Sequence, residues 1–226
     1  MGARADKLKH ARLTTPVTEA QLADLEIGQV VFIDGLIYTA REGVYTRYLE
    51  AGERPPVDFA ALTNVNFHCA PAAAPREDGG YNIGAVTATA SFRFAKYLEP
   101  WFAETATRVI IGKGGMSGEH YRKLFAPAGA VYLTTVGYGT GALLGRAIVG
   151  VEAVNWLDEL GIAQAMWILK VRNFGPLLVE YDRTGASLFE TNNARIAARV
   201  DALYEGLKEP ALRRYGESRD KTDEVI

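Results

Sequence analysis

Short runs of apolar residues dominate this chain, and glycine, proline or aspartate bounds most of them. Runs of about four to eight residues rich in valine and isoleucine are typical of β-strands. Asp34-Gly35 favours the positive φ angles of a tight turn, so the first two runs would form a hairpin. We therefore predict strands at residues 29–33, 36–40, 65–69, 82–89, 108–111, 130–136, 165–171 and 177–181, with a turn at 182–185 leading into 186–190.

Helical segments alternate with these runs. Thr18 is followed three residues later by Gln21, which is the capping-box pattern and predicts a helix to about residue 25. Ser117 can cap a second helix that continues through Phe125. Further helices are predicted at 41–50, at 91–105 with a bend or restart near Pro100, and at 140–160.

The last part of the chain changes character. An apolar stripe predicts a closing helix whose face packs on a core or a partner, and it consists of Ile196, Val200, Leu203, Tyr204 and Leu207. We expect a flexible segment at 1–12, one domain at 13–208 and a polar, loosely ordered tail at 209–226. The fold class is α/β with a mixed sheet, because strands and helices alternate and a hairpin is antiparallel.

Composition narrows the function classes. The 226 residues include 25 lysines and arginines and 27 aspartates and glutamates, so the chain lacks the basic surplus that nucleic-acid binding requires. No apolar run approaches the roughly 20 residues that span a bilayer, and the polar N-terminus does not resemble a signal peptide. We expect a cytoplasmic protein with no nucleic-acid or membrane partner.

Cysteine and histidine usage limits the metal chemistry. Cys69 is the one cysteine, so there is no internal disulfide, and a zinc ion or iron-sulfur cluster would need ligands from elsewhere. His10, His68 and His120 lack the spacing of metal ligands. We interpret them as surface residues or hydrogen-bonded packing residues.

The segment 109–117 carries the clearest chemical signal. A strand leads into Gly112-Lys113-Gly114-Gly115 and then into a helix start. Glycines let backbone N–H groups turn toward an anion, and Lys113 adds a full positive charge. The spacing differs from the phosphate-binding P-loop, so a carboxylate suits it better than a nucleotide. Taken alone, the segment also fits a glycine-rich turn with a solvated lysine.

Two arginines and a second glycine-rich loop complete the candidates. Arg41 and Arg93 stand at helix starts, and a guanidinium can bind a carboxylate through two parallel hydrogen bonds, although each also fits a surface position. Residues 137–142 satisfy Gly-x-Gly-x-x-Gly/Ala, but the acidic residue at the expected distance, Asp158, falls in a predicted helix. We interpret this loop as a close-packed turn.

In order and spacing, these segments resemble the β-type domain of the tartrate dehydratase and class I fumarase family. The resemblance covers about residues 15–200, and the Gly-Lys-Gly-Gly-Met and Phe-Gly-Pro-Leu segments look closer to the tartrate dehydratase branch. Its main segments are Thr39-Ala40-Arg41-Glu42, Asn66-Phe67-His68-Cys69-Ala70-Pro71, Thr89 to Arg93, Ile111 to Met116 and Phe174-Gly175-Pro176-Leu177.

The resemblance implies a swivelling β/β/α domain of the class I fumarase C-terminal type. It implies a hydro-lyase subunit that reversibly adds or removes water on tartrate, fumarate, malate or a substituted relative. The [4Fe-4S] cluster would be bound by an α-type partner subunit and not by this chain, which would form a heteromer, a homodimer or both. The implied substrate-binding residues are Arg41, Arg93, Lys113, Gly112 and Gly114, and the implied catalytic residues are Thr89 and Lys113.

Two family motifs are altered here. Arg-Asp-x-x-His becomes Arg41-Glu42-Gly43-Val44-Tyr45, and Gly-Pro-Thr-Thr-x-x-Arg-Met becomes residues 87–94, Thr-Ala-Thr-Ala-Ser-Phe-Arg-Phe. A tyrosine cannot replace a histidine as a proton carrier near neutral pH. Two alternatives therefore stay open: a cluster-independent homo-oligomeric enzyme for another small acid, and a non-catalytic carboxylate-binding or assembly subunit.

Overall fold

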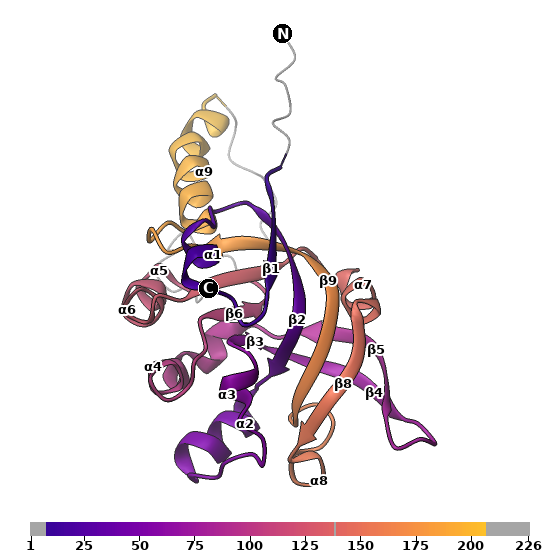
Figure 1. Cartoon of the computed structure of the whole chain (residues 1–226). Coiled ribbons are helices and arrows are strands. Elements are labelled where there is room, and N and C mark those ends of the chain that lie inside the picture. The colour runs from indigo at the N-terminus through magenta and orange to yellow at the C-terminus, as the bar shows by residue number, and fades with distance from the viewer. Residues whose placement is uncertain (1–7, 138, 207–226) are drawn as a thin grey trace, which may run out of the picture. The chain divides into compact units, whose positions relative to one another are not determined.

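The computed structural model describes residues 8–137 and 139–206, and its main feature is a seven-stranded mixed sheet (Figure 1). The sheet has the order β1-β2-β3-β6-β7-β9-β8, and β2 also pairs with β9. That extra pairing joins β2, β3, β6, β7 and β9 into a closed ring. The strands are β1 (His10–Thr14), β2 (Val30–Thr39), β3 (Val65–Phe67), β6 (Val109–Gly112), β7 (Val131–Thr135), β8 (Ile148–Asn155) and β9 (Met166–Tyr181).

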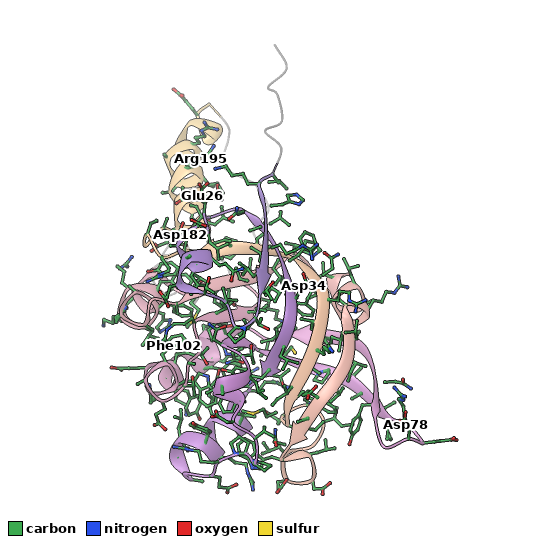
Figure 2. The ribbon with its side chains drawn as sticks, in the orientation of Figure 1. Glu26, Asp34, Asp78, Phe102, Asp182 and Arg195 are labelled. Carbon is green, nitrogen blue, oxygen red and sulfur yellow. The ribbon has the colours of Figure 1, made fainter. Side chains whose placement is uncertain are left out.

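Strand direction divides the sheet into two parts. The pairs β1–β2, β2–β3, β3–β6 and β6–β7 are parallel, whereas β9 runs antiparallel to β2, β7 and β8. The predicted mixed α/β sheet is therefore confirmed. A separate two-stranded hairpin, β4 (Cys69–Pro75) and β5 (Tyr81–Ala88), leaves the sheet, with Asp78 at its tip (Figure 2).

Short helices connect the strands. Thr18 forms the predicted capping box with Gln21, and Ser117 accepts a hydrogen bond from the His120 backbone N–H at 3.2 Å, so both predicted caps are confirmed. The α-helices are α1 (Glu19–Ala23), α2 (Glu42–Tyr45), α3 (Phe59–Leu62), α4 (Ala95–Glu104), α5 (Gly118–His120), α6 (Ala126–Ala128), α7 (Thr140–Arg146), α8 (Leu157–Leu160) and α9 (Leu188–Tyr204). Two π-helical turns, η1 (Thr46–Glu50) and η3 (Tyr121–Phe125), and a 3₁₀ turn, η2 (Ser91–Phe94), extend α2, α5 and α4.

The strands bury both faces, and alternate residues belong to different cores. Val109 and Ile111 of β6 join one apolar cluster, whereas Ile110 between them joins a second cluster rich in aromatic residues. This division follows from the period of two along a strand. The second cluster includes Trp101 and Phe102 of α4, so this helix covers the outer face of the ring.

The predicted hairpin at residues 29–40 is wrong, because β2 is one continuous strand. Gly35 has φ 116° and lies at a register shift between β2 and β9, so it forms a bulge rather than a turn. Asp34 accepts hydrogen bonds from the backbone of Asn173 at 2.7 Å and, through its carbonyl, from Thr15 at 2.9 Å. The Asn173 hydrogen bond holds the pKa of Asp34 below its usual value. The residues that suggested a turn thus connect β2 with β9 and with Thr15, the residue that follows β1.

Four other predictions need correction. The helix predicted at 140–160 is α7, strand β8 and α8, because the valines and isoleucine of 148–155 pair with β9. The strands predicted at 165–171 and 177–181 are one strand, β9. Residues 186–190 contribute a single bridge at Ser187 before α9 begins, and the helix restart predicted near Pro100 falls at Ala95.

The chain divides by its contacts into two units, residues 1–191 and 192–226. The first unit contains every strand named above, and β1 begins at His10, inside the segment 1–12. In the second unit the structure describes the continuation of α9, with Ile196 and Val200 of the predicted stripe. The tail predicted at 209–226 lies outside the described residues.

Candidate active site

The candidate site lies where the parallel strands end. Thr39 of β2 pairs with Phe67 of β3, and Phe67 pairs with Ile111 of β6. The carboxyl ends of these strands therefore meet at one edge of the sheet. Arg41 comes two residues after Thr39, and Lys113 comes two residues after Ile111, so the backbone of each residue reaches this edge.

The end of β5 is inserted at the same edge. The His68 backbone N–H donates to the Ile111 carbonyl at 2.8 Å, and the Thr89 N–H donates to the His68 carbonyl at 2.6 Å. The Lys113 N–H in turn donates to the Thr89 carbonyl at 3.3 Å, and Ala90 forms a parallel bridge with Lys113. The structure thus brings Thr89 and Lys113 next to each other, although 24 positions separate them in the sequence.

A cavity of about 740 Å³ opens beside Lys113. β5, the loop after β6 and the start of α7 form its walls, and its apolar side chains include Val86, Phe92 and Leu144. Among the described residues that line it, Lys113 is the only charged one. Thr87 and Ala90 line the cavity, whereas Thr89 between them is only 8% exposed. The cavity therefore offers one cation in apolar surroundings.

The glycines beside Lys113 are required by close packing and by backbone conformation. A Cβ atom on Gly112 would lie 2.1 Å from Ser91 Oγ and 2.4 Å from the Tyr132 hydroxyl oxygen. Gly114 has φ +75°, which side chains rarely adopt, and it lines the cavity. The loop therefore presents backbone and the lysine side chain rather than other side chains.

The two arginines lie outside this cavity. Arg41 precedes α2, and its Nη1 donates to the Ala163 carbonyl at 2.9 Å. Arg93, on η2, lines a neighbouring hollow of about 530 Å³ with Lys96 and His120. Phe92 lines both the cavity and this hollow. The structure therefore does not bring the three predicted cations into one cavity of this chain.

Tyr45, which stands where the family motif has a histidine, is also outside the cavity. It is fully buried among aromatic side chains, stacks on Tyr97 at 5.3 Å between ring centroids, and its hydroxyl lies 2.6 Å from Nε2 of His68. Burial raises the pKa of Tyr45 well above its usual value and lowers the pKa of His68 to about 3. Both groups are neutral near pH 7, and the altered motif position is internal.

A set of buried polar residues beneath the loop was missed by the sequence reasoning. Of the two interpretations that the sequence leaves open for His68, surface residue or hydrogen-bonded packing residue, its burial and hydrogen bonds agree with the second, but the sequence does not indicate its partners Ser91 and Tyr132. The available signal was Asn66 and His68 two positions apart on a strand, which places both on one face. Nothing in the sequence pairs them with residue 132.

Of the loop predicted to be a close-packed turn at 137–142, Gly141 packs closely, whereas a Cβ on Gly137 or Gly139 would meet nothing within 4 Å. A Cβ on Gly141 would lie 2.7 Å from the Val86 carbonyl oxygen, and one on Gly145 would lie 1.8 Å from that of Gly84. Helix α7 can therefore approach β5 only with glycines at positions 141 and 145. Asp158 lies on α8 and not at a strand end, as predicted.

The donor set of this chain does not fit an iron-sulfur cluster. Cys69 is the single thiol, it is 1% exposed, and burial raises its pKa. Within residues 8–137 and 139–206, no group of three or more histidine, cysteine, aspartate or glutamate side chains is arranged to hold a metal ion. A cluster needs about four such ligands, mostly thiolates.

The sequence matches a known family, because residues 2–192 fit the family model described as fumarase C-terminus. The chain belongs to this family, which confirms the resemblance found in the sequence. The predicted class, a β-type subunit of a hydro-lyase, is also confirmed. Among the helices that the structure describes, none is both long enough and apolar enough to cross a membrane.

Named relatives agree with this family. A protein of Methanocaldococcus jannaschii, provisionally named L(+)-tartrate dehydratase subunit beta, is 33% identical over 190 residues, 83% of this chain and 95% of the relative. The L(+)-tartrate dehydratase subunit beta of Escherichia coli K12 is 27% identical over 199 residues, 87% of this chain and 95% of the relative. A Geobacillus stearothermophilus protein, provisionally named class I fumarate hydratase, is 35% identical over 178 residues, which are 79% of this chain but 33% of that longer relative.

Proposed function

We propose that this chain is the β-type subunit of a dehydratase that adds or removes water on a small dicarboxylic acid. The observation that carries the proposal is the cavity at the carboxyl edge of the parallel strands, where Lys113 meets the backbone of Thr89. The names of the relatives, tartrate dehydratase and fumarate hydratase, support the substrate class.

In this proposal Lys113 binds one carboxylate of the substrate. The ammonium group is the charged group in an otherwise apolar cavity, where a charge-assisted hydrogen bond is stronger than in water. The exposed backbone at Gly114 and the packed Gly112 keep the loop free of side chains that would compete for the anion. Arg93, in the neighbouring hollow, and Arg41, at the same sheet edge, are the proposed ligands of the second carboxylate.

Thr89 is proposed to lie near the carbon that loses or gains a proton. Its hydroxyl is a weak acid and needs a base to take part in proton transfer near pH 7. We propose that an α-type partner supplies both this base and the iron-sulfur cluster, because the described part of this chain lacks the cluster's ligands. A cluster supplies a Lewis acid for the departing hydroxyl group when it is bound. The subunit-beta names of the relatives support such a partner.

Co-expression tests the proposal. The chain and an α-type subunit encoded in the same genome would be produced together under anaerobic conditions and assayed with tartrate, malate and fumarate. Lys113→Ala should reduce kcat/KM by roughly 10- to 100-fold or more, since a hydrogen bond to a charged group contributes about 1.5–3 kcal/mol. Lys170→Ala is the matched control, because Lys170 is an exposed lysine on β9 outside the cavity. Unchanged turnover by the Lys113 variant would contradict the site.

A second candidate is a cluster-independent enzyme acting on another small acid. The apolar walls of the cavity favour it, because a hydroxyl-rich substrate such as tartrate gains little from Val86 and Phe92. Turnover of a dicarboxylate by the purified chain after iron has been removed would establish this candidate. Dicarboxylate binding by calorimetry without turnover, with and without the partner, would instead indicate a binding or assembly subunit.

A further inference from the structure

A chain of buried polar side chains runs beneath the Lys113 loop. Asn66 Nδ2 lies 2.7 Å from the Tyr45 hydroxyl, which lies 2.6 Å from His68 Nε2. His68 Nδ1 lies 2.7 Å from Ser91 Oγ, and Ser91 Oγ lies 2.8 Å from the Tyr132 hydroxyl. All five side chains are 0% exposed. Nothing in the proposed chemistry above uses them.

The hydrogen bond at the Lys113 end of this row of side chains fixes the direction of the other hydrogen bonds in the row. The Tyr132 hydroxyl lies 3.4 Å from the Lys113 carbonyl oxygen, which can only accept. Tyr132 therefore donates to Lys113 and must accept from Ser91. Because the single Ser91 proton is then used, Ser91 accepts from Nδ1 of His68. This order requires the proton of His68 to be on Nδ1.

The other end of the chain is consistent with the same order. Asn66 Nδ2 donates to the Tyr45 oxygen, so the Tyr45 proton points to Nε2 of His68. Nε2 must then be unprotonated. Burial lowers the pKa of His68 to about 3, so the ring is neutral and carries one proton. The Tyr45 end therefore agrees with the tautomer that the Lys113 end assigns.

His68 is connected to both halves of the candidate site. Its carbonyl oxygen accepts the Thr89 N–H at 2.6 Å, while its ring connects through Ser91 and Tyr132 to the Lys113 carbonyl. Gly112 packs directly on this connection, because an added Cβ would meet Ser91 and Tyr132. The His68 ring is therefore connected, through Ser91 and Tyr132, to the backbone at Gly112 and Lys113.

We infer that His68, held as its Nδ1–H tautomer by this directed hydrogen-bond chain, is the positioning residue that fixes the Lys113 loop against Thr89. His68 does not contact the ligand, since the described lining of the cavity contains neither its ring nor its partners Ser91 and Tyr132. The effect on turnover rests on the function proposed above. The tautomer of His68 and its effect on the loop rest on the geometry of the hydrogen-bonded side chains alone.

Nuclear magnetic resonance tests the tautomer directly. Protein labelled with ¹⁵N-histidine has three histidines, and His68→Phe assigns the signals of residue 68 by their loss. We expect a protonated Nδ1, an unprotonated Nε2 and no titration between about pH 5 and 8, because the pKa is about 3. A protonated Nε2, or a ring that becomes cationic in this range, would overturn the inference.

Amide spectra of the variants test the positioning role without any enzymatic assay. His68→Phe removes both ring nitrogens, whereas His68→Asn keeps an amide donor near the position of Nδ1. The amide signals of Gly112 and Gly114 should shift in the phenylalanine variant and return toward wild-type values in the asparagine variant. His10→Phe, at an exposed position on β1, should leave them unchanged. If both residue-68 variants leave these amides unchanged, His68 does not position the loop.

Kinetics of the assembled enzyme give the matching functional result. His68→Phe should lower kcat/KM roughly 100-fold, the scale of loss when reacting groups are displaced by about 1 Å. His68→Asn should recover at least about tenfold of this loss, and equal kinetics for His68→Phe and wild type would contradict the inference. If the wild-type assembly has no dehydratase activity, the proposed function fails, while the tautomer and amide shifts still decide the role of His68. If His68→Phe does not fold, His68→Asn and the wild-type tautomer decide it.

Discussion

Glu180 provides a prediction of how stability depends on pH. This carboxyl group, one residue before the end of β9, is 0% exposed. The Tyr121 hydroxyl donates to one of its oxygens and the Ser187 hydroxyl donates to the other, the latter at 2.7 Å. Burial outweighs these hydrogen bonds and raises the pKa of Glu180 from 4.5 to about 7. The carboxyl group therefore keeps its proton more readily in the folded chain than in the unfolded chain.

The direction and size of the effect follow from this difference. Because the folded state binds the proton more tightly, the stabilisation is fully present below about pH 4.5 and is lost as the pH rises to about 7. A difference of about 2.5 pKa units corresponds to about 3 kcal/mol, at 1.36 kcal/mol per unit. Between pH 5 and 8 the wild-type chain should lose roughly 2–3 kcal/mol from this group alone.

Replacing Glu180 by glutamine isolates the effect. Glutamine has nearly the same shape and cannot ionise, so the variant lacks this part of the pH dependence. Urea unfolding at pH 5, 6, 7 and 8 measures the free energy of unfolding of both proteins. The value for Glu180→Gln minus the value for wild type should rise by roughly 2–3 kcal/mol from pH 5 to pH 8. Glu152→Gln is the control, because Glu152 is exposed on β8. Parallel curves for wild type and Glu180→Gln would refute the reasoning.

Three further substitutions test packing and capping. Thr18→Ala removes the capping box of α1 and should lower the free energy of unfolding by about 1 kcal/mol, measured by urea unfolding, with no change in dicarboxylate affinity. Gly145→Ala should lower it by about 1–3 kcal/mol or more, because the new Cβ would lie 1.8 Å from the Gly84 carbonyl oxygen and would push α7 from β5. Gly112→Ala should weaken dicarboxylate binding in calorimetry, since its Cβ would displace Ser91 and the loop; unchanged affinity would show that the loop tolerates the shift.

Local signals in the sequence predicted local structure well. The cap at Thr18 depends on residues three positions apart, and the strand at Val109–Gly112 depends on one apolar run, so both could be predicted. The bulge at Gly35 could not, because Asp34-Gly35 satisfies the chemistry of a turn as well as that of a bulge. The choice is made by Asn173 of β9 and by Thr15, which follows β1, because both bond to Asp34 from positions far from it in the sequence.

The site shows the same limit. Lys113 was predicted from its glycines, and its strand places it at the sheet edge. Its contact with Thr89 depends on β5 returning to that edge, which no local pattern encodes. Arg93 lies on the 3₁₀ turn that starts at Ser91, where the sequence predicts a regular helix, and it lines the neighbouring hollow and not the cavity. The resemblance to the family identified the candidate residues, but their distances required the fold.

The pairing of β9 has a consequence for synthesis of the chain. β2 is synthesised early. The strand that pairs with one of its edges, β9 (Met166–Tyr181), leaves the ribosome only after β3, β6 and β7 have been made. During most of translation this edge of β2 therefore has unpaired backbone N–H and C=O groups. Such an edge readily pairs with a strand of another polypeptide. A product truncated before residue 166 would keep that edge uncovered, and we expect it to aggregate or to be bound by chaperones.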